Sequence, residues 1–182
     1  CALPWPSDKY LVPDTGRDSG FRLEFGETTL PKNKEGVQMK PERYAVLDGY
    51  GVGVPLMAIL PNLDADQLLG ERDIADTIHP DADIVWLEIT DAGAERVPYY
   101  AELDPFQADP ARRIVHVRPA RVLKPGTRYV VGFRDLEDTD GARILPSRAF
   151  AALRDGVAAQ TEYPQLAERQ AGNNLRGRRN GH

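Results

Sequence analysis

The sequence predicts a mainly β protein: a β-sandwich with an extended N-terminal arm and a short helical C-terminal segment. Several short runs alternate apolar and polar residues with the period of two that is typical of half-buried strands. The 15 prolines and 16 glycines favour many short strands and turns over long helices. We expect residues 1–20 to form the arm, residues 21–150 the sandwich, and residues 151–182 a helical segment with a polar linker or cut end.

The clearest strand covers residues 128–134. Three of its apolar residues share one face: Tyr129, Val131 and Phe133. Val130 is the apolar exception on the opposite face. A shorter strand precedes it, in which Val115 and Val117 alternate with polar residues. Alternate side chains along such runs can bury one layer against another, which is the basis of the sandwich prediction.

A tight corner, residues 123–129, joins these two strands and reads Leu-Lys-Pro-Gly-Thr-Arg-Tyr. Pro125 presets φ, and Gly126 supplies the positive φ that the turn needs. The string resembles the corner of fibronectin type III and bacterial Ig-like domains, where a Tyr hydrogen-bonds back to the corner backbone. This resemblance implies an Ig-like or fibronectin III-like sandwich, in which the Tyr129 hydroxyl bonds to a spare carbonyl between Val122 and Gly126. An ordinary hairpin turn with a core tyrosine is the alternative.

The middle of the chain adds two further strands. Residues 84–89 predict a strand, with three aliphatic side chains on one face: Val85, Leu87 and Ile89. A hairpin turn at residues 90–94 leads into a returning strand over residues 96–103, where Pro98 indicates an edge or a bulge. Residues 60–78 are acidic and partly helical in pattern.

The N-terminal arm holds Trp5 and Tyr10, which we expect to pack across a sheet face. Residues 21–25 alternate as a strand, and residues 39–47 fit a short helical turn. The G-x-G-x-G run from Gly49 to Gly53 lacks the helix and the Lys of a phosphate-binding loop, so we expect close backbone contact or a bulge there.

Composition limits the partners. The net charge of −5 and the pI of about 5.3 disfavour nucleic acid and anionic membranes. No apolar run reaches the roughly 18 residues that a membrane span needs, so we expect no transmembrane segment. Cys1 is the only cysteine, which excludes a disulfide within the chain. It could be the acylated first residue of a lipoprotein, half of a disulfide to another chain, or an accident of where the chain was cut.

Two groups of acidic residues are candidate metal sites. Asp135, Asp138 and Asp140 could hold calcium through oxygen ligands, although Asp-Gly turn chemistry alone also explains them. His79, near two further aspartates, precedes a proline and is more simply a surface residue. No other cofactor is expected.

The sequence shows no catalytic set. The serines are Ser7, Ser19 and Ser147, and all of them stand in turn contexts. No G-x-S-x-G motif occurs. The histidines are too few and too scattered for a zinc site: His79, His116 and His182. We therefore predict no catalytic residue in this chain.

Three segments resemble one bacterial family. Residues 1–8 (CALPWPSD) resemble a C-x-x-P-F-P-N/S-D opening, and residues 47–51 (LDGYG) resemble an x-D-G-F-S segment. The third is the Ig-like corner followed by residues 136–141 (LEDTDG). Together they are similar to the N-terminal region of large secreted or surface bacterial lipases and related α/β-hydrolase-fold proteins. Trp5 stands where Phe is common, and Gly51 where Ser is common.

The resemblance implies an extracytoplasmic location and a non-catalytic module or chain of an esterase or lipase. In that family the nucleophile lies downstream, so the implied partner is a catalytic α/β-hydrolase domain or a second chain. The family often continues past a segment such as residues 178–182 into the hydrolase part. Two alternatives stay open: a free-standing surface binding or adhesion module, and the shorter chain of an enzyme matured by cleavage.

Overall fold

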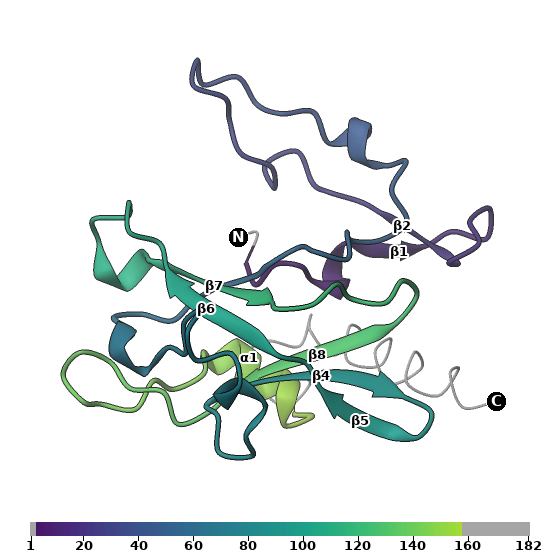
Figure 1. Ribbon diagram of the computed structural model, residues 1–182. Coiled ribbons are helices and arrows are strands. Elements are labelled where there is room, and N and C mark those ends of the chain that lie inside the picture. The colour runs from purple at the N-terminus through teal and green to yellow at the C-terminus, as the bar shows by residue number, and fades with distance from the viewer. Residues whose placement is uncertain (1–2, 158–182) are drawn as a thin grey trace. The chain divides into compact units, whose positions relative to one another are not determined.

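The computed structural model describes residues 3–157 and is mainly β, as predicted (Figure 1). The chain divides into two compact units, Cys1–Ile144 and Leu145–His182. All described strands belong to the first unit, and the described α-helix, α1 (Arg148–Arg154), belongs to the second. Within the described residues, no helix has the length and apolar character that crossing a membrane requires.

Two three-stranded antiparallel sheets make up the sandwich and lie in separate layers (Figure 1). The first has the order β3-β7-β6: β3 (Leu56–Ile59), β7 (Ile114–Pro119) and β6 (Tyr99–Leu103). The second has the order β5-β4-β8: β5 (Gly93–Arg96), β4 (Ile84–Thr90) and β8 (Arg128–Phe133). The two strands flanking the predicted corner therefore belong to different sheets, and the corner carries the chain from one layer to the other.

The core lies between these sheets. Val115 and Val117 of β7 are fully buried, and they face side chains of the other sheet such as Trp86 and Val131. β-branched and aromatic residues suit this interior because they pack well on a pleated surface. The predicted faces of β7 and β8 are confirmed, since Tyr129, Val131 and Phe133 pack against the core.

The central strand β4 turns an unexpected face inward. Ile84, Trp86 and Glu88 point into the sandwich, so the side carrying Val85 and Leu87 faces outward. Alternation could not decide between the two sides, because β4 is apolar on both. The pairing of Trp86 with Val131 aligns the inward residues of β4 with those of β8.

The returning strand expected over residues 96–103 is wrong as a single element. β5 ends at Arg96 in one sheet, and β6 begins at Tyr99 in the other. The Val97 N–H still donates to the Trp86 carbonyl, whereas the Pro98 carbonyl accepts from the Ala120 N–H, one residue past the end of β7 in the opposite sheet. Pro98 has no N–H for a ladder, so the strand breaks where the chain changes sheets.

The N-terminal region forms its own small sheet, β1 (Leu11–Pro13) with β2 (Phe21–Leu23). The strand expected at residues 21–25 therefore pairs with the arm and not with the sandwich. Five rings gather beside it with centroids 5.1–5.8 Å apart: Trp5, Tyr10, Phe25, Tyr44 and Tyr50. Trp5 also exchanges two backbone hydrogen bonds with Met57 of β3, which ties the arm to the sandwich.

Short 3-10 helices fill several connections: Asp8–Tyr10, Pro41–Tyr44, Ala65–Gln67, Asp76–Ile78 and Pro110–Arg112. They account for the helical character expected near residues 39–47 and 60–78. The expectation of close backbone contact from Gly49 to Gly53 is wrong, because an added Cβ at Gly49, Gly51 or Gly53 would meet nothing within 4 Å. Cys1, the helix expected beyond residue 157 and the polar C-terminal segment lie outside the described residues.

Candidate functional site

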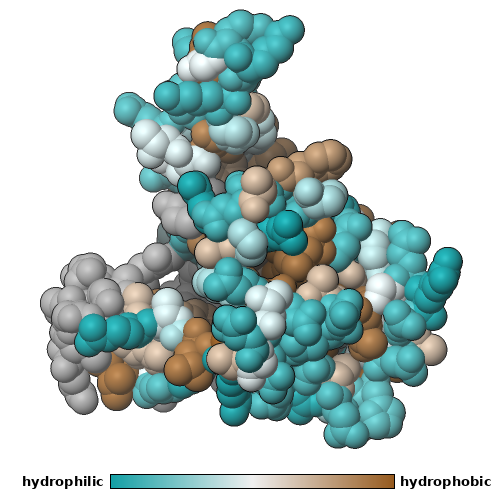
Figure 2. Space-filling model, turned by 90° about the vertical axis from the view of Figure 1, so that its left-hand side faces the viewer, coloured by the Kyte–Doolittle hydropathy of each residue, from teal (hydrophilic) through white to brown (hydrophobic). Residues whose placement is uncertain are grey.

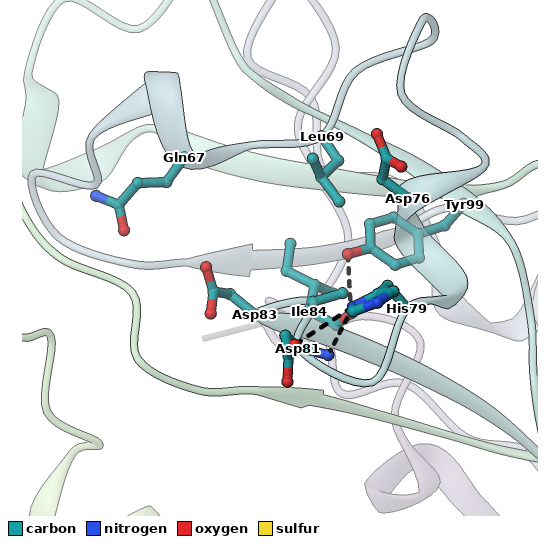
Figure 3. A pocket seen from close by; sticks show the side chains of 9 residues that line it. Gln67, Leu69, Asp76, His79, Asp81, Asp83, Ile84 and Tyr99 are labelled. Atoms are coloured by element: carbon teal, nitrogen blue, oxygen red, sulfur yellow. Dashed lines mark hydrogen bonds and ion pairs between the residues drawn. The ribbon is translucent and has the colours of Figure 1, made fainter.

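A shallow acidic hollow of about 410 Å³ lies beside the start of β4 (Figure 3). The His79 Nδ1 accepts from the Asp81 N–H at 3.4 Å and lies 3.5 Å from the Asp81 carboxylate. Figure 3 shows Asp76, Asp81 and Asp83 spread around the Tyr99 ring, with their carboxylates well apart. In the described part of the chain, no three His, Cys, Asp or Glu side chains are grouped to hold a metal ion. The hollow therefore lacks the convergence that a metal site needs.

Tyr99 is buried and lines this hollow. Its hydroxyl donates to the Ile84 carbonyl at 2.8 Å. Ile84 lies past the end of the β4–β5 pairing, so β5 does not bond to this carbonyl. Burial raises the pKa of Tyr99 to about 12. The phenol stays protonated at neutral pH, and its proton is committed to the backbone. Tyr99 therefore links the two sheets, from β6 to β4, and is not placed to transfer a proton.

The three aspartates proposed for calcium lie in the turn after β8. Asp138 Oδ1 accepts from the backbone N–H groups of Asp140 and Ala142, at 3.0 and 2.9 Å. Asp135 forms an ion pair with Arg143 at 2.6 Å. The Asp138 carboxylate stabilises the local backbone, and Asp135 is neutralised by a cation. Turn chemistry, the alternative to calcium, accounts for these contacts.

The predicted corner has Gly126 at φ +64°, where a positive φ suits glycine. The Tyr129 hydroxyl accepts a hydrogen bond from the Lys124 N–H at 2.8 Å. It therefore bonds to the corner backbone within the expected range, but to an amide and not to a carbonyl. Its own proton is left for Glu88 Oε2, which lies 3.3 Å away. Pro125 precedes Gly126 in the turn that holds Lys124 in place.

Glu88 is the central charge of this corner. Its side chain is 1% exposed, yet each carboxylate oxygen has a cation 2.5 Å away: Arg121 on Oε2 and Lys124 on Oε1. Hydrogen bonds from Arg121 and then from Lys124 lower the pKa of Glu88 to about 2. The same contacts raise the pKa of Lys124 and of Arg121. The carboxylate stays ionised and links β4 to the loop between the two sheets.

Serine and histidine side chains form no nucleophile–base pair among residues 3–157. Ser7 and Ser147 accept from backbone N–H groups at the starts of helices, and Ser19 bonds to the backbone of Phe21. His116 lies on the outer side of β7, and its buried Nδ1 has no hydrogen-bond partner there. His182 and Cys1 are outside the described residues.

The outer face of the β5-β4-β8 sheet is apolar along its middle. Ile89 of β4 is 37% exposed and Val130 of β8 is 42% exposed. Half-buried Leu87 lies directly opposite Val130, and Val85 lies opposite Gly132. The central strand of the other sheet, β7, presents His116 and Arg118 outward. The face drawn in Figure 2 is mostly hydrophilic, with hydrophobic side chains in small separate groups.

This apolar stripe (Val85, Leu87, Ile89 and Val130) is the residue set that sequence reasoning did not identify as a site. Two signals could have found it. The β4 segment is apolar on both faces, and Val130 is the apolar exception on the polar face of β8. Antiparallel sheets commonly turn one polar face to water, so apolar residues on both sides of a central strand indicate a second contact.

The chain matches no protein-family model, and no curated protein or solved structure is significantly similar to it.

Proposed function

We propose that this chain is a non-catalytic β-sandwich module of an extracytoplasmic hydrolase of the esterase or lipase type. In this proposal it packs on a catalytic domain through the apolar stripe of the β5-β4-β8 sheet. The observation that carries the proposal is the exposed pair Ile89 and Val130, placed beside Leu87 on a face that is commonly polar. Burying a fully exposed Val or Ile contributes roughly 1.5–3 kcal/mol, and Ile89 and Val130, at 37% and 42% exposure, would each contribute less than half of that. A partner that covers the stripe would therefore gain from each of these residues.

The residues of the arm support the choice of partner. Two of the three segments that resemble the lipase family come together: the Tyr50 hydroxyl donates to the Ser7 carbonyl at 2.7 Å. The Trp5 and Tyr50 rings pack edge to face at 5.1 Å. A Phe at either position would keep much of this ring packing, which fits the aromatic residues of the family pattern. The described serines are engaged by the backbone, in keeping with a nucleophile located in another domain.

A photo-cross-linking experiment tests the proposal. A photoreactive phenylalanine analogue replaces Val130 in the natural gene product, and after irradiation an active-serine fluorophosphonate probe is added. We expect the Val130 adduct to join this chain to a polypeptide segment that carries the probe, because the catalytic serine lies in the partner. The same analogue at Glu102, exposed on the outer side of β6, is the matched control and should give no such adduct.

Each other result counts against the proposal. Labelling of residues 1–182 by the probe would place the nucleophile in this chain. An adduct at Val130 with an unlabelled protein would favour the binding or adhesion alternative. Equal adducts from Val130 and Glu102 would mean that the apolar stripe is not a preferred contact.

A further inference from the structure

Three of the four sheet edges in the sandwich are covered or blocked. The outward N–H and C=O groups of Met57 on β3 bond to the backbone of Trp5. On β6, the outward N–H of Ala101 donates to the Leu69 carbonyl at 2.8 Å. β5 is only four residues long, carries Glu95 and Arg96, and is followed by a proline. Short length, charges and nearby proline are the usual protections of an edge strand.

Among residues 3–157, the fourth edge, β8, is open. The Arg134 N–H donates to the Asp83 carbonyl, which fixes the alternation of the β4–β8 ladder. It follows that Arg128, Val130 and Gly132 direct their backbone groups toward β4. The alternate residues are Tyr129, Val131 and Phe133, and their N–H and C=O groups point away from the sheet. Within the described part of the chain, nothing is hydrogen-bonded to these groups.

The side chains along this edge specify what could pair with it. Arg128 is exposed, and no described residue forms an ion pair or hydrogen bond with its guanidinium. Val130 is an exposed apolar position on the same outer side. A Cβ at Gly132 would meet nothing within 4 Å, which leaves room above the strand for a bulky side chain.

The geometry points to β8 as an acceptor edge for one antiparallel strand of a partner polypeptide. That strand has an acidic residue opposite Arg128, an aliphatic residue opposite Val130 and an aromatic residue over Gly132. Its backbone bonds to Tyr129, Val131 and Phe133 and extends the sheet to a fourth strand. The inference rests on the proposed function for the source of this strand, which is the domain that covers the apolar stripe.

A second copy of this chain fits the edge less well. Antiparallel pairing about a two-fold axis at Val131 would place Arg128 of each copy opposite Arg134 of the other. The Arg134 guanidinium already donates to the carbonyls of Pro80 and Ala82, so it cannot turn away freely. Like charges directly opposite each other destabilise a strand pair. An axis at Val130 would instead place each Arg128 opposite Gly132, without an acidic partner, so charge favours an acidic strand from a different polypeptide.

A blocked peptide, Ac-Thr-Val-Tyr-Val-Val-Thr-Glu-NH2, tests this inference on the full chain. In antiparallel register its Glu faces Arg128, its Tyr faces Gly132, and its second, fourth and sixth amides face the open edge. We expect saturable binding at about 1 mM or below. Amide hydrogen exchange at Tyr129, Val131 and Phe133 should slow on binding. A peptide whose own second, fourth and sixth amides are N-methylated should not bind. Replacing the Glu of the peptide with Lys should weaken binding about fivefold.

The outcomes separate this inference from the proposed function. Failure of the peptide to bind, or binding of the N-methylated peptide with equal strength, overturns strand addition. Binding that shifts the Leu87 and Val130 methyl resonances without protecting the edge amides also overturns it, although the apolar stripe would remain a docking face. The cross-linking experiment at Val130 does not depend on the peptide, so each claim can fail alone.

Discussion

The two sheets of the sandwich have the same number of strands and differ in how completely this chain satisfies them. In the β3-β7-β6 sheet, Trp5 covers one edge, Leu69 covers the other, and the central strand presents His116 and Arg118 outward. In the β5-β4-β8 sheet, the β8 edge is open among the described residues, and the central strand presents aliphatic side chains outward. The first sheet has both edges covered, whereas the second has an open edge and the features of a surface that a partner completes.

The inner faces differ as well. The β3-β7-β6 sheet contributes only apolar side chains and Tyr99 to the core, whereas the other sheet contributes Glu88 with its two cations. A buried carboxylate is tolerated because both oxygens are paired. It also joins β4 to the corner that carries Lys124 and Tyr129. The less complete sheet is thus tied by charge and hydrogen bonds to the loop that connects the two layers.

Substituting a Val with Asp on each sheet should give the largest difference. Val117 is fully buried, so Val117→Asp should lower the free energy of unfolding by more than about 4 kcal/mol. Val130→Asp makes the same chemical change on the outer side of β8 and should cost about 1 kcal/mol or less in the isolated chain. Chemical denaturation followed by tryptophan fluorescence measures both. Equal costs would mean that Val130 is already buried.

Acid should weaken the Glu88 cluster next. The pKa of Glu88 is lowered from 4.5 to about 2, so its ion pairs contribute fully above pH 4.5. That contribution should disappear as the pH falls from about 4.5 to about 2. The denaturation midpoint of Glu88→Gln should therefore lie below that of the parent at pH 7, and the gap should close over this acidic range. A gap that stays constant with pH would show that ionisation of Glu88 is not the cause.

Removing the Tyr99 hydroxyl tests a hydrogen bond between the two sheets, from β6 to β4, with a smaller change. Tyr99→Phe should cost about 1–2 kcal/mol, because the Ile84 carbonyl loses its partner in a buried place. The free energy of unfolding from urea titration is the readout. Tyr100→Phe, on the outer side of the same strand, is the matched control and should be close to neutral. Similar losses at both positions would contradict a specific role for the Tyr99 hydroxyl.

The smallest effect expected is at the corner. Tyr129→Phe removes the acceptor of the Lys124 N–H and one contact with Glu88, and should cost about 1 kcal/mol. The Lys124 amide lies at an exposed position, so water can replace part of the lost bond. Urea denaturation of the variant beside Tyr99→Phe ranks the two hydroxyls. An unchanged midpoint for Tyr129→Phe would remove the corner hydrogen bond from the account.

Local pattern predicted much of the fold. The runs around Val115, Val117 and Val131 alternate, and the structure buries those residues as alternation requires. β4 was located correctly but its inward face was not indicated, because both of its sides are apolar and only cross-strand packing selects one. The change of sheet at Pro98 was visible only as a break, since a proline shows where a ladder stops but not where the chain goes next.

The candidate site was harder to predict than the strands. In the cluster at Glu88, Arg121 and Lys124 follow Glu88 by 33 and 36 positions in the sequence. No local spacing indicates that these three residues meet. The aspartates near Asp138 formed a visible group, but the Asp138 carboxylate bonds to its own turn and Asp135 pairs with Arg143. The open edge of β8 depends on what the rest of the chain fails to cover, which is a property of the whole fold.

Native-state amide hydrogen exchange on the isolated chain tests the contrast between the sheets most directly. The outward amides of Met57 and Ala101 are bonded to Trp5 and Leu69, so they should exchange slowly. The outward amide of Val131 should exchange at a nearly unprotected rate, while that of its neighbour Val130, bonded toward β4, stays protected. Protection of Val131 equal to that of Ala101 would show that the β8 edge is already paired, and would contradict the claim that this sheet awaits a partner.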